Sequence, residues 1–154
     1  MPETKARVLV IGRQAGVLPP GLPETSTGAD YVVAEDMDAV RANLADCDVV
    51  YHFGNPRDAL RANWDLARRL RWVQVAGVGI DWALFPELVE SDVTLTNSHG
   101  VFDTTLPEYL LALMLGLVKG LPGTVRSQAA VEWRHRLQEP LAGGRAVIVG
   151  AGSI

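Results

Sequence analysis

RAVIVGAGSI, residues 145–154, is the stretch that decides the fold class. Ala146 to Val149 predict a short strand, and Gly150-Ala151-Gly152 predict a tight turn directly after it. A dinucleotide-binding βαβ unit begins in this way, because the first glycine makes the turn and the second lets the backbone approach a pyrophosphate. The sequence ends one residue before the third glycine of that pattern would stand. The stretch is therefore a weak signal by itself, and its meaning depends on the residues before it.

Length and composition favour a single ordinary globular core. The chain has 154 residues, of which 48% are hydrophobic and 21% are charged, and these values argue against disorder. Its 14 basic and 18 acidic residues give a net charge of −4, which offers no basic footprint for nucleic acid. We therefore expect no nucleic-acid partner.

The sequence also predicts a cytoplasmic protein without a membrane span. Cys47 is the only cysteine and can form no internal disulfide, and the amino terminus lacks an apolar signal segment. The longest apolar run, Leu110 to Val118, has nine residues, about half of what a membrane span needs. We interpret that run as a buried helix.

Apolar runs that alternate with helical patterns predict a parallel α/β sheet. Strands are expected at residues 6–11, 31–34, 48–53, 72–75 and 93–96. Asp36 or Asp38 could cap a helix over 39–45, Asn55-Pro56 predicts a helix start, and Asp81 is expected to cap a short helix over 82–89. The simplest arrangement is flavodoxin-like or another doubly wound fold.

Three arginines, Arg68, Arg69 and Arg71, precede the fourth predicted strand. They could form an anion site, but cations in the last turn of a helix also complement its dipole, and we favour this second interpretation.

After residue 100 the pattern becomes helical. Thr105-Leu106-Pro107-Glu108 matches a capping box that opens a helix to about Lys119. Its leucines surround the helix instead of lining one stripe, so the helix must be covered on all sides. Gly120, Pro122 and Gly123 are expected to end it, with a second helix at about 124–131.

The turn Gly77-Val78-Gly79 is the strongest candidate site. It follows a predicted strand, at the sheet edge where open α/β folds bind ligands, and its backbone N–H groups could face an anion. A binding role and a simple tight turn remain equal alternatives at this point.

The histidines are weaker candidates for a functional site than this turn. His52 is expected in the sheet and His135 in solvent, and Ser98, His99 and Asp103 are too close in sequence to form a catalytic triad. No Cys, His, Asp or Glu spacing predicts a metal site.

Several blocks in order resemble the NAD(P)-dependent D-2-hydroxyacid dehydrogenase family. They are residues 70–81 (LRWVQVAGVGID), 93–97 with Gly100, 107–115 (PEYLLALML), Trp133 and 141–154. The match covers about residues 48–154. Pro107 and Tyr109 flank Glu108 where the family often has Ala before this Glu and His or Leu after it, which leaves the subfamily open.

This resemblance implies a flavodoxin-like substrate domain over residues 1–100. It implies that residues 101–154 form interdomain helices and the truncated start of a Rossmann NAD(P)-binding domain. Gly77, Val78 and Gly79 would bind the substrate carboxylate, and the pyrophosphate of NAD or NADP would lie against Gly150, Gly152, Ser153 and Ile154. The catalytic Arg, His and acidic residue of the family map onto no position here, so the resemblance implies no catalytic residue in this chain.

Two functional hypotheses follow. The first is an amino-terminal portion of an oxidoreductase that transfers hydride between NAD(P)H and a small 2-keto or 2-hydroxy acid, inactive alone and dimeric in its full-length form. The alternative is a non-catalytic α/β module that binds an anion or a partner chain. In both cases the apolar helix predicts a homo-oligomer.

Overall fold

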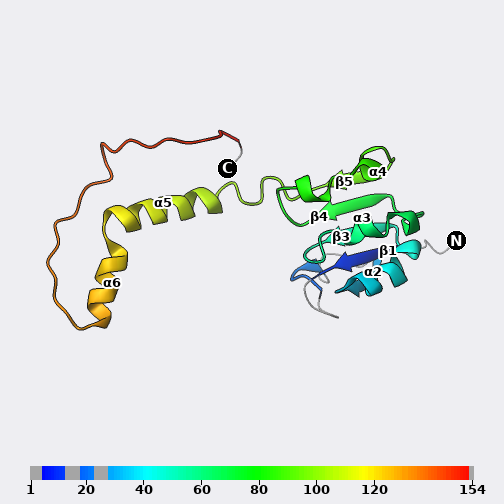
Figure 1. Cartoon of the computed structure of the whole chain (residues 1–154), viewed down its shortest axis with the longest axis horizontal. Coiled ribbons are helices and arrows are strands. Elements are labelled where there is room, and N and C mark those ends of the chain that lie inside the picture. Colours follow the sequence, from blue (N-terminus) through cyan, green and yellow to red (C-terminus); the bar gives the residue numbers. More distant parts are fainter. Residues whose placement is uncertain (1–4, 13–17, 23–27, 153–154) are drawn as a thin grey trace. The chain divides into compact units, whose positions relative to one another are not determined.

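The computed structural model describes residues 5–12, 18–22 and 28–152. The chain divides into two compact units, Met1–His99 and Gly100–Ile154. The first unit holds a parallel sheet with short helices, and the second holds two longer helices (Figure 1).

The sheet of the first unit has five strands, and all of its pairings are parallel. The strands are β1 (Ala6–Ile11), β2 (Ala29–Ala34), β3 (Val49–His52), β4 (Trp72–Val75) and β5 (Thr94–Thr96), in the spatial order β2-β1-β3-β4-β5. Val8, for example, lies opposite Tyr31 of β2 and Val49 of β3. This order is the flavodoxin-like doubly wound arrangement, so the predicted fold class is confirmed. The order of the strands reverses between β1 and β3, which are neighbours in the sheet. In folds of this kind, the crevice that binds a ligand lies at the carboxyl ends of the strands at such a reversal.

The core lies between one face of the sheet and its helices. Helices α2 (Met37–Asn43), α3 (Ala59–Ala62) and α4 (Pro86–Val89) contribute Val40, Leu60 and Leu88 to one buried cluster. Alternate strand residues, among them Leu9 and Val50, reach the same cluster, because successive side chains of a strand point to opposite faces. Each such burial stabilises the fold by roughly 1.5–3 kcal/mol.

The expected capping of α2 is confirmed. Asp36 has extended backbone angles, and its Oδ1 accepts a hydrogen bond of 2.8 Å from the backbone N–H of Ala39. The side chain thereby satisfies a backbone donor that has no partner within the helix.

The predicted helix start at Asn55-Pro56 is wrong. The peptide bond between these residues is cis, and the carbonyl of Pro56 accepts hydrogen bonds from Ala59 N at 3.4 Å and from the His52 ring. Pro56 therefore belongs to a turn, and α3 begins at Ala59. Residues 55–57 become a loop at the carboxyl end of β3.

Two further helix predictions need correction. In place of one helix over 82–89, a 3-10 turn, η3 (Asp81–Ala83), precedes the four-residue α4. Asp81 lies inside η3 and makes no capping hydrogen bond. The break comes at Leu84 and Phe85, which have extended backbone angles and put Pro86 at the start of α4.

The second unit is formed by α5 (Thr105–Val118) and α6 (Leu121–Ala129), which meet at a bend of 65°. Gly120, which was predicted to end α5, is also the N-cap of α6, and its φ of 63° lies in the region that glycine favours. Helix α6 begins at Leu121, three residues earlier than expected. The predicted capping box is wrong: the N-cap is Thr104, whose helical backbone angles do not suit a side-chain cap, and it makes none. No single helix among the described residues is long and apolar enough to cross a membrane, although the bent pair α5 and α6 passes the same test of length and composition.

The predicted strand over Ala146–Val149 does not form. Residues 130–152 contain no helix or strand, and Val147 and Val149 are more than 90% exposed. A parallel strand gains its hydrogen bonds from a neighbour, and no described strand pairs with these residues. An apolar run alone was therefore not sufficient to make this strand.

Candidate functional site

A cleft of about 330 Å³ opens at the carboxyl ends of β3 and β4. This is the edge at which open parallel sheets bind their ligands. Residues that follow the two strands, together with Trp82 of η3, line the cleft: His52, Phe53, Gly54, Asn55, Arg57, Gly77 and Trp82.

The carbonyl groups of the Gly77-Val78-Gly79 turn are all held by hydrogen bonds. Gly77 O accepts from Ser98 N at 3.1 Å, and Val78 O accepts from the Asn97 side chain at 2.6 Å. Gly79 O accepts from Trp82 Nε1 at 3.1 Å. Three donors from two other segments therefore fix the orientation of the peptide groups in this turn.

The N–H groups of the same turn have no hydrogen-bond partner within the described chain. Both glycines have room for a larger side chain. A Cβ at Gly77 would meet only Gly79 O, at 3.8 Å, and a Cβ at Gly79 would meet nothing within 4 Å. Neither glycine has a positive φ. The absence of side chains instead leaves the backbone donors open to approach, which is the use of glycine at anion sites.

Arg57 adds a positive charge to the cleft. Its guanidinium carbon lies 5.7 Å from the centre of the Trp82 ring, an arrangement in which the aromatic face attracts the cation. Trp82 in turn packs against His52, with ring centres 4.7 Å apart, and donates to Gly79 O. The indole thus supports both the guanidinium and the glycine turn.

His52 is buried at the base of the cleft and is held neutral. Its Nε2 lies 3.1 Å from Pro56 O, and because a carbonyl can only accept, this nitrogen must carry the proton. Burial lowers the pKa of His52 from 6.5 to about 4, and the nearby Arg57 charge acts in the same direction, against the opposing effect of the Pro56 hydrogen bond. The prediction that His52 belongs to the sheet and its core is confirmed.

The other predicted site residues belong to the second unit. Gly150 and Gly152 lie in the extended segment without a strand, and Gly150 has a φ of 96°, in the region that glycine favours. Ser153 and Ile154 lie outside the described residues. The described residues form no strand before this turn, and the contacts of these residues with NAD or NADP stay a prediction.

The loop after β5 supports the glycine turn and forms no catalytic triad. Ser98 Oγ lies 3.4 Å from Val75 O, and the Ser98 N–H donates to Gly77 O. His99 and His135 are exposed. Across the described ranges, no three His, Cys, Asp or Glu side chains come together as a metal site would require.

Solved structures share this architecture. A D-isomer specific 2-hydroxyacid dehydrogenase family protein from Aeromonas salmonicida matches 91% of this chain with a TM-score of 0.70 and 17% identity. An NADPH-dependent glyoxylate/hydroxypyruvate reductase from Sinorhizobium meliloti, solved with citrate, matches 91% with a TM-score of 0.70 and 22% identity. The D-mandelate dehydrogenase of Rhodotorula graminis matches 84% with a TM-score of 0.61 and 21% identity.

The chain shares the fold of these dehydrogenases. The resemblance seen in the sequence is thus confirmed at the level of the fold. The matched region spans 44% of the first two solved chains and 41% of the third, less than half of their length. Scans of protein-family models and of curated proteins gave no match.

Sequence reasoning missed Arg57 and Trp82 as members of the site. A helix that begins at Asn55-Pro56, as the sequence predicts, would include Arg57 in its first turn and would give no reason to place it in a site. The signal that could have revealed it is the position of residues 53–57 directly after β3, beside the point where the strand order reverses.

Proposed function

We propose that the cleft at the carboxyl ends of β3 and β4 binds the carboxylate of a small 2-keto or 2-hydroxy acid. The observation that carries this proposal is the Gly77-Val78-Gly79 turn, whose carbonyls are held by other segments while its N–H groups have no partner among the described residues. Backbone N–H groups and a guanidinium are the donors that carboxylates bind most strongly. Arg57 supplies the guanidinium in the same cleft as Gly77.

The chain would then be the substrate-binding portion of an NAD(P)-dependent oxidoreductase of the D-2-hydroxyacid dehydrogenase type. The shared fold supports this proposal, and solved neighbours include NADPH-dependent reductases, one of them in complex with NADP and malonate. The proposal assigns carboxylate binding, and not hydride transfer, to the described residues. Contacts of Gly150, Gly152, Ser153 and Ile154 with NAD or NADP remain a prediction from the resemblance.

Replacing a glycine of the turn tests the proposal. Gly77→Ala should weaken glyoxylate binding at least about tenfold, because the added Cβ stands where the carboxylate approaches the backbone, a loss of roughly 1.4 kcal/mol. The fold should be unaffected, since that Cβ meets only one atom, at 3.8 Å. Affinity can be measured by calorimetric titration, with circular dichroism as the check on folding.

Gly28→Ala is the matched control, because Gly28 lies before β2, outside the cleft, and a Cβ there would meet nothing within 4 Å. It should leave glyoxylate affinity unchanged. Equal binding by a folded Gly77→Ala protein and the unaltered chain would contradict the proposal.

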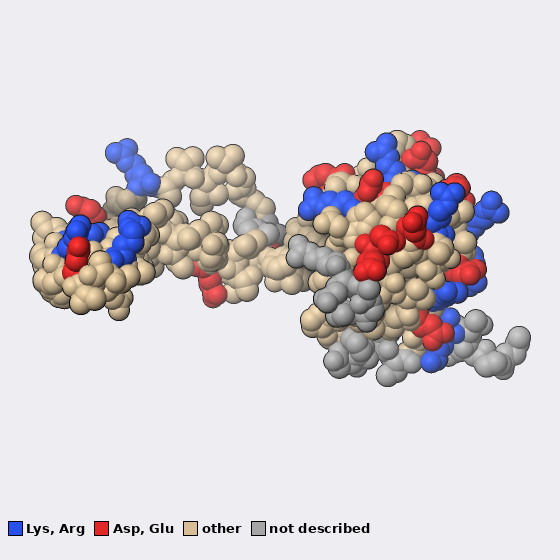
Figure 2. All heavy atoms as spheres, turned by 60° about the horizontal axis from the view of Figure 1, so that its bottom comes forward, with Lys and Arg blue, Asp and Glu red and all other residues tan. Residues whose placement is uncertain are grey.

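A second function, association with another copy of the chain, is favoured by a separate observation. No residue of α5 is buried, and Leu110, Leu113 and Leu117 are 54%, 46% and 73% exposed. Figure 2 shows charged side chains spread over the visible face of the sheet unit, whereas Glu108 is the one charged residue of α5. Apolar surface of this kind marks an interaction site, so we propose that α5 pairs with α5 of a second copy in a homo-oligomer.

A further inference from the structure

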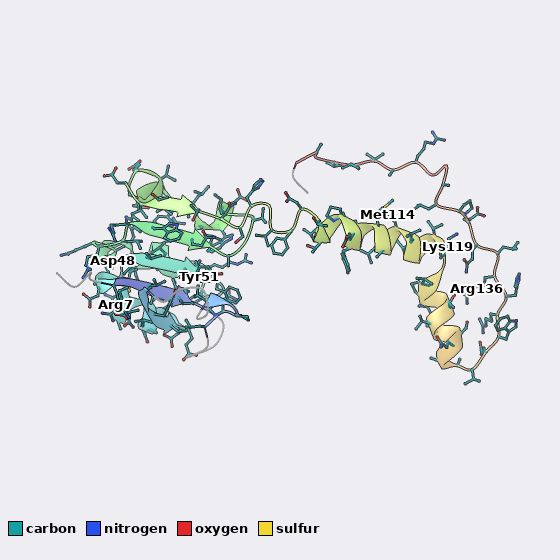
Figure 3. The ribbon with its side chains drawn as sticks, turned by 180° about the vertical axis from the view of Figure 1, so that it is seen from behind. Arg7, Asp48, Tyr51, Met114, Lys119 and Arg136 are labelled. Carbon is teal, nitrogen blue, oxygen red and sulfur yellow. The ribbon has the colours of Figure 1, made fainter. Side chains whose placement is uncertain are left out.

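A second cleft lies at the amino end of the sheet, opposite to the candidate site. It has a volume of about 360 Å³ and is lined by Lys5, Ala6, Asp48, Arg69 and Arg71. These residues stand at the starts of β1, β3 and β4, and the three strands are parallel neighbours. Their starts therefore meet at one edge, where Figure 3 shows Asp48 and Arg7.

Asp48 is a fixed and ionised centre of this cleft. Its Oδ2 accepts from Arg7 N at 3.0 Å, and its Oδ1 accepts from Arg69 Nη2 at 3.1 Å. The Arg7 backbone N–H, with Arg69 and Arg71 beside it, holds the pKa of this carboxyl below its usual value despite the opposing effect of burial. The side chain is only 12% exposed. Asp48 thus positions Arg69 and neutralises one positive charge.

Two positive charges remain without a close counter-charge. Lys5, Arg69 and Arg71 bring three positive charges, and Asp48 brings one negative charge. Arg71 reaches Asp48 only at 4.0 Å and is 76% exposed, and no acidic side chain of the described residues pairs with Lys5. Arg68 and Asp92 line the adjoining cleft and add no net charge.

The favoured sequence interpretation of these arginines is wrong. Arg69 and Arg71 were expected to complement the dipole at the end of a helix, but α3 ends at Ala62 and the following 3-10 turn, η2 (Trp64–Leu66), ends before Arg68. Arg69 and Arg71 instead lead into β4, with their guanidinium groups at the cleft. The alternative of an anion site is the one that the structure favours.

We propose that the cleft at the amino end of the sheet binds a small phosphate monoester as its dianion. Two uncompensated positive charges match two negative charges, and guanidinium groups fit phosphate oxygens with paired hydrogen bonds. The volume lies at the lower end of the range for small-molecule pockets, roughly 300–1,000 Å³, which leaves room for an organic group on the phosphate. The proposal does not depend on the function proposed for the opposite edge.

The test is a calorimetric titration of the full chain with glycerol phosphate, inorganic phosphate and acetate. We expect glycerol phosphate to bind at least as tightly as inorganic phosphate, and acetate to bind much more weakly because it carries one charge. The double substitution Lys5→Gln and Arg71→Gln should weaken phosphate binding about tenfold, since it removes two charge-assisted contacts. Both side chains are exposed, so the fold should be retained.

Arg41→Gln is the matched control, because it removes one exposed arginine from α2 outside the cleft. It should leave phosphate affinity unchanged. Weakening by Arg41→Gln that is as large per charge removed as the weakening by the double substitution would overturn the proposal, because binding would then follow net charge alone. Acetate binding that is as tight as phosphate binding and is lost in the double variant would overturn it as well, because the cleft would then not distinguish one negative charge from two.

Discussion

His52 shows how strongly one buried residue can tie stability to pH. Its ring is 3% exposed, donates to Pro56 O and packs on Trp82, so its protonated form is disfavoured in the folded chain. In the unfolded chain the same ring takes up a proton below about pH 6.5. The folded state binds fewer protons between the two pKa values, and its stability therefore falls as the pH falls.

We predict that acidification from pH 7 to pH 4 lowers the free energy of unfolding by up to roughly 3 kcal/mol through His52 alone, since its pKa falls from 6.5 to about 4 on folding. His52→Phe keeps an aromatic ring against Trp82 and should remove this part of the pH dependence. Urea unfolding of both proteins across this pH range measures the difference. Parallel pH profiles would show that His52 does not titrate in this way.

Single residues were predictable where their local pattern is strong. Strand alternation placed His52 in the sheet, and the Asp36 cap followed from its position before an apolar helical run. The place of Arg57 in the cleft was not predictable from the sequence. The sequence predicts a helix from Pro56, which would include Arg57, whereas α3 begins three residues later, at Ala59, and leaves Arg57 in the loop that lines the cleft. The roles of Asp48 and Arg69 were hidden too, since they lie 21 residues apart and meet only through strand pairing.

Among the secondary-structure elements, α5 carries the clearest consequence. A helix that is apolar on all sides must be covered, and its own unit buries no residue of α5. Each large apolar side chain left in water forgoes roughly 1.5–3 kcal/mol of burial. For four such side chains the loss is roughly 6–12 kcal/mol, which is comparable to the free energy of unfolding of a typical domain, about 5–15 kcal/mol.

We predict that the chain self-associates through α5. Its sedimentation coefficient should rise with protein concentration, and the triple substitution Leu110→Gln, Leu113→Gln and Leu117→Gln should return it to that of a monomer. Val89→Gln on α4 is the control, because Val89 is 65% exposed but lies in the sheet unit. A concentration-independent, well-folded monomer of the unaltered chain would count against this interface.

The strand predictions show why some elements can be predicted and others cannot. The first and fourth strands have the expected bounds. The second and fifth differ by two residues and one residue at their starts, and the third is one residue shorter at each end. The same apolar pattern over Ala146–Val149 gives no strand, because strand formation depends on a neighbour as well as on sequence. The hydrophobic pattern therefore predicts whether a segment tends to form a strand, and hydrogen bonding to a neighbouring strand decides whether it does.

For the whole molecule, the order of motifs was more informative than any one motif. Strands and helices in alternation predicted the parallel sheet, and the spatial order of the strands then placed Gly77 and Arg57 at one edge and Lys5 and Arg71 at the other. The Gly150-Ala151-Gly152 turn follows no strand among the described residues, and its contacts with NAD or NADP stay a prediction. The function proposed for this chain therefore depends on the earlier glycine turn.

The most direct test of that function is a nuclear magnetic resonance titration of the labelled chain with glyoxylate, observing the backbone N–H groups of Gly77, Val78 and Gly79. We expect these three signals to shift together and saturate, and the Gly77→Ala protein to lose the response. Signals that stay unchanged at saturating glyoxylate, or shifts confined to other parts of the chain, would contradict it.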